Sequence, residues 1–253
     1  MSLMKDNLFY KTIFLTGKAT IRTFGHLIDL IDGKIVFSEP DSIGGLKILE
    51  DNYLHILTEL EGVMKNREIP GIDEFFVEQG LLAENRSWKS FPLFIYGTEF
   101  LNNTALCPKT RELLLGVDGF SSAMFSVLTA GKHIPEHKGI YKGVLRAHLG
   151  LIVPPKANGE CFITVDGQKS YWENGKLILF DDAHVHSAHN ETDMDRVVLF
   201  IDVIRPLPWP LSILNKLMFN LLAKSSFISE TVKKYEQFGN KSSQKIEIEF
   251  KQK

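Results

Sequence analysis

Several features are scarce in this sequence, and each absence narrows the class of protein. Only Cys107 and Cys161 are cysteines among 253 residues, which excludes a disulfide framework and makes a reducing compartment the default. The formal net charge is only −2, so the composition gives no reason to expect a nucleic acid as partner. No uninterrupted apolar run reaches the roughly 18 residues of a membrane-spanning helix. The N-terminus also lacks a signal-peptide pattern, so we expect a cytoplasmic protein.

The composition predicts three segments along the chain. Residues 1–86 are expected to be mostly helical, because leucines recur at helical spacing between Ile43 and Lys65. Residues 87–206 contain short β-rich runs separated by Gly, Pro, Asn and Asp, which is typical of a β-sandwich or a jelly roll. These runs are Phe91–Tyr96, Ala123–Leu128, Val144–Val153, Cys161–Val165, Leu177–Phe180 and Val197–Ile204. We predict a mainly β (α+β) fold with the helical region packed on it.

Residues 207–253 form a basic tail. From Arg205 to Lys245 the chain has seven Lys or Arg against two acidic residues. After the RPLPWP sequence, apolar residues recur at helical spacing over residues 211–224, which predicts an amphipathic helix. This helix either packs on the domain or makes a peripheral contact with a membrane, which would then be the inner membrane surface.

Histidines are concentrated in the β-rich segment, where six of the eight lie between His133 and His189. Within the predicted strand around His148, the side chains of Arg146, His148 and Gly150 share one face. A second segment contains His184 and His186. Two neutral imidazoles on neighbouring strands can chelate one metal ion, although a lone buried histidine is also an ordinary core residue. No third protein ligand is evident, because the residue two positions after His148 is Gly150 and not a carboxylate.

Arg196 begins a run that predicts a buried strand. A buried guanidinium requires a carboxylate or phosphate partner. Asp182, Asp195 or Asp202 would satisfy it within the chain; a bound acid beside the metal is the alternative.

Six sequence motifs occur in a characteristic order between Ile72 and Pro206. They are WKSFPL from Trp88, CPKT from Cys107, FSVLTAGKHIPEH from Phe125, LRAHLGLIVP from Leu145, LFDDAHVH from Leu179 and RVVLFIDV from Arg196. Together they resemble the aspartyl/asparaginyl β-hydroxylase family of dioxygenases that depend on iron(II) and 2-oxoglutarate. The resemblance implies a double-stranded β-helix, which is a jelly roll of the cupin-like kind, and dioxygen as the oxidant.

The resemblance also implies roles for particular residues. His148 and His186 fall on the two iron ligands, and Arg196 falls on the arginine that binds the distal carboxylate of 2-oxoglutarate. His137 and Arg146 match positions near the active site, where they are expected to hold cosubstrate or substrate. His184 and His189 do not fall on ligand positions.

The substrate expectation rests on the branch of the family. The YKGVLRAHLGL sequence from Tyr141 and the basic tail look closer to the bacterial lipid A hydroxylases, whose usual N-terminal membrane segment is not seen here. A lipid acyl chain is therefore the first expected substrate. The alternatives are hydroxylation of a peptide at Asp or Asn, and a non-catalytic jelly-roll module that binds a metal.

Overall fold

The computed structural model describes residues 8–75, 82, 86–226 and 228–237. Its strands are β1 (Phe37–Ser38), β2 (Trp88–Ile95), β3 (Thr98–Glu99), β4 (Phe120–Leu128), β5 (His133–His137), β6 (Val144–Ile152), β7 (Cys161–Val165), β8 (Gln168–Tyr171), β9 (Leu177–Phe180), β10 (His186–Asn190) and β11 (Arg196–Ile204). Its helices are α1 (Leu8–Asp32), α2 (Ile48–Asp51), α3 (Tyr53–Asn66), α5 (Leu101–Thr104), α6 (Pro108–Leu115) and α7 (Leu211–Ala223), with short 3-10 turns η1 (Pro40–Ser42), η2 (Ile72–Glu74) and η3 (Lys156–Asn158). Residues 228–237 are also helical.

The strands form two antiparallel sheets, and the chain crosses from one sheet to the other several times. One sheet has the order β1-β9-β6-β11-β4-β2-β3 and the other has the order β5-β10-β7-β8. From β4 to β11 the chain passes back and forth between the two sheets, which is the arrangement of a double-stranded β-helix. The expected jelly roll is therefore confirmed.

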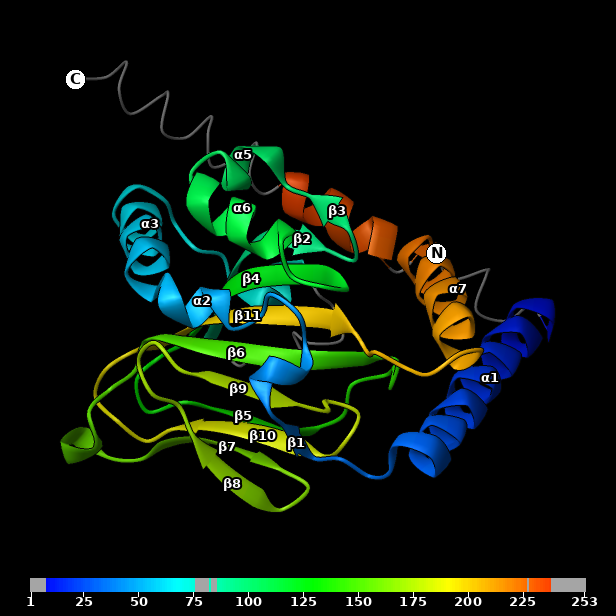
Figure 1. Ribbon diagram of the computed structural model, residues 1–253. Helices are drawn as coiled ribbons and strands as arrows, with labels where there is room; N and C mark the ends of the chain where they lie inside the picture. The colour runs from blue at the N-terminus through cyan, green and yellow to red at the C-terminus, as the bar shows by residue number, and fades with distance from the viewer. Residues whose placement is uncertain (1–7, 76–81, 83–85, 227, 238–253) are drawn as a thin grey trace.

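Three layers are stacked in the molecule (Figure 1). Helices α2, α3 and α6 cover the outer face of the seven-stranded sheet, and the four-stranded sheet lies on the other side. Side chains point alternately to the two faces of a strand, so the same strands contribute to two hydrophobic cores. Leu149 and Leu199 belong to the core beneath the helices, whereas Ile163 and Val198 belong to the core between the sheets.

The helical region differs in detail from the prediction. One helix was predicted from Ile43 to Lys65, but the chain forms α2 and α3 with a break at Asn52. The side-chain amide of Asn52 donates to the carbonyl of Ile48 at 2.9 Å, a local hydrogen bond of the kind that competes with helix continuation. The sequence also predicts a short helix over residues 72–82, of which only residues 72–75 and 82 lie within the described part of the chain. The segment boundaries at 86 and 206 remain predictions.

Helices α1 and α7 pack against each other at one end of the two sheets (Figure 1). They share a small core, to which α1 contributes Phe24 and Ile28 and the tail contributes Leu211 and Phe219. Within the described part of the chain, no helix is both long enough and apolar enough to cross a membrane.

Candidate active site

The candidate site lies on the inner face of the seven-stranded sheet. In the pairing of β6 with β11, Phe200 is directly opposite His148. The even-numbered residues of both strands face the second sheet, because side chains alternate along a strand and Leu149 lies on the helix side. His148 and Arg196 therefore project into the space between the sheets, where sequence alternation placed them.

His186 reaches the same space from the opposite sheet, at the start of β10. Both imidazoles are buried, and both contact the Phe180 ring, with centroid distances of 5.1 Å for His148 and 5.8 Å for His186. Burial lowers the pKa of both side chains, that of His186 to about 3, and the charge on Arg196 lowers that of His148 further. The two rings are therefore neutral at pH 7, which is the protonation state that binds a metal.

Among the residues that the structure describes, the hydrogen bonds of His186 leave one ring nitrogen free. Its Nδ1 lies 2.9 Å from the carbonyl oxygen of His184, so Nδ1 carries the proton and donates it. The lone pair on Nε2 then points away from that bond, available to a ligand. This pattern, one nitrogen held by a backbone carbonyl and the other free, is common in metal-binding histidines.

His148 has a different partner. The indole N–H of Trp172 donates to His148 Nδ1 at 3.3 Å, and Nε2 is buried without a hydrogen-bond partner among the described residues. In this contact the neutral ring carries its proton on Nε2. A metal bound at Nε2 would require the proton to move to Nδ1, and the Trp172 bond would break. That bond is long, so its loss costs little.

These observations fit a metal held by two histidines. Within the described ranges, no group of three or more His, Cys, Asp or Glu side chains is placed to hold a metal ion. Two neutral imidazoles with free or orphaned Nε2 atoms supply two ligands, and solvent or a chelating cosubstrate would complete the coordination.

Arg196 is the most unusual residue of the site. It is 1% exposed, and its Nε and Nη1 atoms have no hydrogen-bond partner in the part of the chain that the structure describes. Burial lowers the pKa of its guanidinium to about 10, and the guanidinium lies 4.5 Å from the centre of the Trp172 ring. Such a buried and unpaired guanidinium is expected to bind an anion that is not part of this chain.

The aspartates that offered an internal partner are engaged elsewhere. Asp195 accepts the backbone N–H of Ala130 at 3.0 Å. Asp202 binds Arg146 through two hydrogen bonds of 2.8 and 3.1 Å, and Asp182 binds the same guanidinium at 2.9 Å. None of the three is placed as the partner of Arg196 among the described contacts.

Arg146 thus lies in the interior with its charge already neutralised. Burial opposes the charge on Arg146, but Asp182 and Asp202 outweigh it and the pKa is raised. The structure places Arg146 as part of an ion-pair network beside the site, with its guanidinium 4.2 Å from the centre of the Phe200 ring. This geometry favours positioning of the neighbouring strands over direct binding of a cosubstrate.

Three other histidines that the sequence analysis considered, His137, His184 and His189, have different surroundings. The ring of His137 lies 4.1 Å from that of His186, so His137 borders the site. His184 lies instead near Asp166 and Asp181, at 3.5 and 3.9 Å. His189 stacks on Phe162 at 4.7 Å, away from the His148 cluster.

Trp172 and Phe180 complete the site, and neither was predicted from the sequence as a site residue. Trp172 contacts His148 and Arg196, and Phe180 contacts His148 and His186. Trp172 directly follows β8, a strand that was not predicted because its QKSY sequence has little apolar character. Phe180 ends the predicted strand Leu177–Phe180, and the alternating direction of side chains along a strand could have placed it on the inner face.

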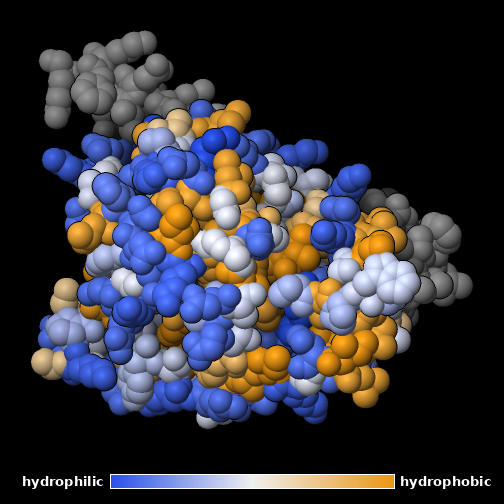
Figure 2. Space-filling view, viewed as in Figure 1, coloured by the Kyte–Doolittle hydropathy of each residue, from blue (hydrophilic) through white to orange (hydrophobic). Residues whose placement is uncertain are grey.

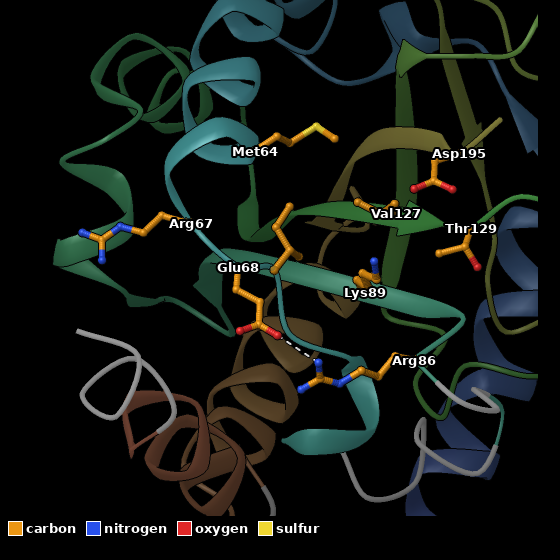
Figure 3. A pocket seen from close by; sticks show the side chains of 9 residues that line it. Met64, Arg67, Glu68, Arg86, Lys89, Val127, Thr129 and Asp195 are labelled. Atoms are coloured by element: carbon orange, nitrogen blue, oxygen red, sulfur yellow. Dashed lines mark hydrogen bonds and ion pairs between the residues drawn. The ribbon is translucent and has the colours of Figure 1, made fainter. Parts of the chain in front are cut away.

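A separate pocket of about 470 Å³ lies on the outer side of the same sheet. Figure 3 shows its charged lining, in which Arg86 binds Glu68 at 2.9 Å. Lys89 of β2 and Asp195, the residue before β11, also line the pocket. The pocket lining contains none of the site residues that the sequence predicted, so the two features are distinct.

The fold and these residues define a class: a jelly-roll protein with two buried, neutral histidines and a buried arginine between its sheets. The sequence profile of the aspartyl/asparaginyl β-hydroxylase family matches residues 50–206, and the chain belongs to this family. It is a family of hydroxylases, which supports an enzymatic role for the chain.

Individual relatives agree with this assignment. An ornithine lipid ester-linked acyl 2-hydroxylase of Rhizobium tropici is 38% identical over 194 residues, which cover 76% of this chain and 69% of that protein. The human aspartate β-hydroxylase domain-containing protein 2 is 32% identical over 182 residues, which cover 67% of this chain and 47% of that protein. The chain thus spans about two thirds of the first relative and about half of the second.

Solved structures are similar only at the level of the fold. A cupin domain of an XRE family transcriptional regulator from Enterobacter cloacae matches 47% of this chain and 99% of its own, with a TM-score of 0.33 and 15% identity.

Proposed function

We propose that the protein is an iron(II)- and 2-oxoglutarate-dependent dioxygenase that hydroxylates an unactivated C–H bond. The observation that carries this proposal is the buried, unpaired guanidinium of Arg196 in the same interior as two neutral histidines. A metal beside a free cation matches a chelating acid with a second carboxylate, which is the chemistry of 2-oxoglutarate.

Each residue then has a defined task. His148 and His186 would hold the iron through Nε2, and Arg196 would bind the distal carboxylate of 2-oxoglutarate. Bound iron would supply the activation of dioxygen, with one oxygen atom entering succinate as carbon dioxide is lost and the other entering the substrate. Trp172 covers one face of Arg196, and Phe180 lines the space beside both histidines; together they exclude water.

The substrate class that we favour is a lipid acyl chain. The Rhizobium relative carries that activity in its name and matches most of this chain. Hydroxylation of a peptide at Asp or Asn is the second candidate, supported by the names of the animal relatives. We also propose that the helix at residues 211–224 makes a peripheral contact with the inner, cytoplasmic membrane surface.

The test is the production of succinate. The protein is loaded with Fe(II) in the absence of oxygen and then given 2-oxoglutarate and dioxygen, with ornithine lipids and Asp-containing peptides as candidate substrates. We expect metal-dependent succinate from the wild type and none from His148→Ala. A protein that neither makes succinate nor binds 2-oxoglutarate would instead be a metal-bearing binding module.

A further inference from the structure

Helices α1 and α7 expose an unusual amount of apolar side chain to solvent. Leu30 of α1 is 83% exposed, and Trp209, just before α7, is 80% exposed. We call the whole set the two-helix surface: Leu27, Leu30 and Ile31 of α1, with Trp209, Ile213, Leu214, Leu217 and Leu221 of the tail.

These side chains belong to one region of the molecule. On their buried sides, Phe24 and Ile28 of α1 and Leu211 and Phe219 of α7 belong to one hydrophobic cluster. Figure 2 shows apolar atoms over α7 and over the C-terminal end of α1 on the same face. A surface of this kind on two packed helices marks a site of interaction rather than scattered exposed leucines.

The orientation of α7 is fixed by a buried asparagine. Asn215 is fully buried, donates to the carbonyls of Gly143 and Arg205 at 2.9 and 3.1 Å, and accepts from the Tyr141 hydroxyl. These bonds hold the Asn215 side of the helix against the protein. Leu217, two positions along, must then face outward, although hydrophobicity alone would favour the reverse.

The free charges around the surface are basic. Both carboxylates of α1 form ion pairs with cations of the domain: Asp29 binds Lys142 at 2.8 Å and Asp32 binds Arg205 at 2.8 Å. No acidic residue occurs in the sequence from Val203 to Ser229. Arg22, Lys34, Lys216 and Lys224, which lie on the two helices or next to them in the sequence, are exposed cations that these acids do not neutralise.

The surface is also connected to the candidate active site. Phe219, on the buried side of α7, stacks on Tyr96 with a centroid distance of 5.5 Å. Burial and the nearby carboxylates of Asp202 and Asp182 raise the pKa of Tyr96, and both carboxylates bind Arg146, two residues before His148. The two-helix surface is thus linked through Phe219 and Tyr96 to the ion pairs of Arg146, on the strand that carries His148.

We infer that α1 and α7 together form a docking surface for an anionic lipid bilayer, with the exposed apolar side chains entering the interface and the surrounding cations contacting lipid phosphates. The inference rests on the proposed function in one respect, since a bilayer would present the acyl substrate. It goes beyond a single tail helix, because it assigns α1 an equal part and selects anionic over neutral lipid.

The experiment measures binding of the full chain to vesicles without metal, 2-oxoglutarate or turnover. Vesicles of phosphatidylcholine alone are compared with vesicles that also contain phosphatidylglycerol, by co-sedimentation. Trp88 and Trp172 are buried, so a blue shift of tryptophan emission reports on Trp209. We expect binding and a blue shift with anionic vesicles, reduced by salt, and loss of the shift in Trp209→Phe.

Substitutions test each helix separately. Leu221→Glu on α7 and Leu30→Glu on α1 should each weaken binding about tenfold or more, because an apolar contact is lost and a repelled charge is added. The paired change Lys216→Glu with Lys224→Glu should weaken binding only to anionic vesicles, also about tenfold. Leu54→Glu on α3 is the matched control, since Leu54 is 69% exposed and Leu221 is 65% exposed, and it should bind as the wild type does.

Three outcomes would overturn the inference. They are equal binding by the Glu variants and the wild type, no binding to anionic vesicles, and a dimer in solution that Leu217→Glu dissociates, which would assign the surface to a second copy of the chain. Vesicle binding without succinate production would count against the proposed chemistry alone. Succinate production without vesicle binding would count against the docking surface alone.

Discussion

Arg196 costs stability, and this cost can be measured. The pKa of its guanidinium falls from 12.5 to about 10 on burial, which corresponds to roughly 3 kcal/mol against the charged form. The cation–π contact with Trp172 returns up to about 2 kcal/mol. Arg196→Met keeps most of the volume and removes the charge. We therefore expect this variant to be more stable than the wild type by about 1–3 kcal/mol.

Thermal unfolding with and without 2-oxoglutarate separates stability from binding. For a chain of this size, a gain of 1 kcal/mol raises Tm by about 2–4 °C. The wild type should be stabilised by about 2.7 kcal/mol when 2-oxoglutarate is present at 100 times its Kd, with the metal site loaded by a redox-inert divalent ion. Arg196→Met should start from a higher Tm and show almost no further shift.

Arg146→Met provides the contrast. Its loss leaves Asp182 and Asp202 buried without their partner, so we expect destabilisation by about 3–5 kcal/mol. If Arg196→Met were instead destabilised to a similar extent, Arg196 would have a structural partner. If it still responded to 2-oxoglutarate as the wild type does, its assigned role would be wrong.

Three further predictions follow from the same geometry. His186→Ala should weaken Co(II) binding at least about tenfold by calorimetry, whereas His184→Ala should change it little; the reverse order would exchange their roles. Gly150→Ala should lower the free energy of unfolding in urea by about 1–3 kcal/mol, because the added Cβ would lie 2.2 Å from the carbonyl oxygen of Glu173. Burial raises the pKa of the Cys161 thiol to about 11, so in the native state at pH 8 it should react with a disulfide reagent far more slowly than after unfolding; equal rates would contradict its burial.

The jelly roll could be predicted because its signals are local. Each β-rich run alternates or is continuously apolar, and turn residues separate the runs. Strands β4, β6 and β11 therefore match the predicted runs to within three residues at each end. The strands β5 and β8 were not predicted, since their sequences HIPEH and QKSY are mostly polar and lie in the smaller sheet. Pairing with neighbours, not intrinsic preference, makes them strands.

The candidate site was only partly predictable, for a related reason. The alternation around His148 and the strand at Arg196 put both side chains on an inner face, which is a local inference. Asp202 cannot reach Arg196, because the two lie six positions apart on β11, which is about 20 Å of extended strand. Its partner is Arg146, which the register of β6 with β11 places opposite it. No sequence pattern fixes that register, so the sequence alone does not show that Arg146 is paired.

The buried face of α7 is likewise set by distant contacts, and the periodicity of its apolar residues does not identify that face. Its apolar residues occupy more than half of the helix circumference, so the pattern predicts an amphipathic helix but not which part of the apolar surface is buried. The choice is made by Asn215, whose three polar contacts lie 10 to 74 residues away in the sequence. Turning α7 to bury its leucines would leave those buried polar groups unpaired, at about 1–3 kcal/mol each. The exposed leucines are thus a consequence of satisfied hydrogen bonds, and a bilayer would recover the hydrophobic free energy that this orientation gives up.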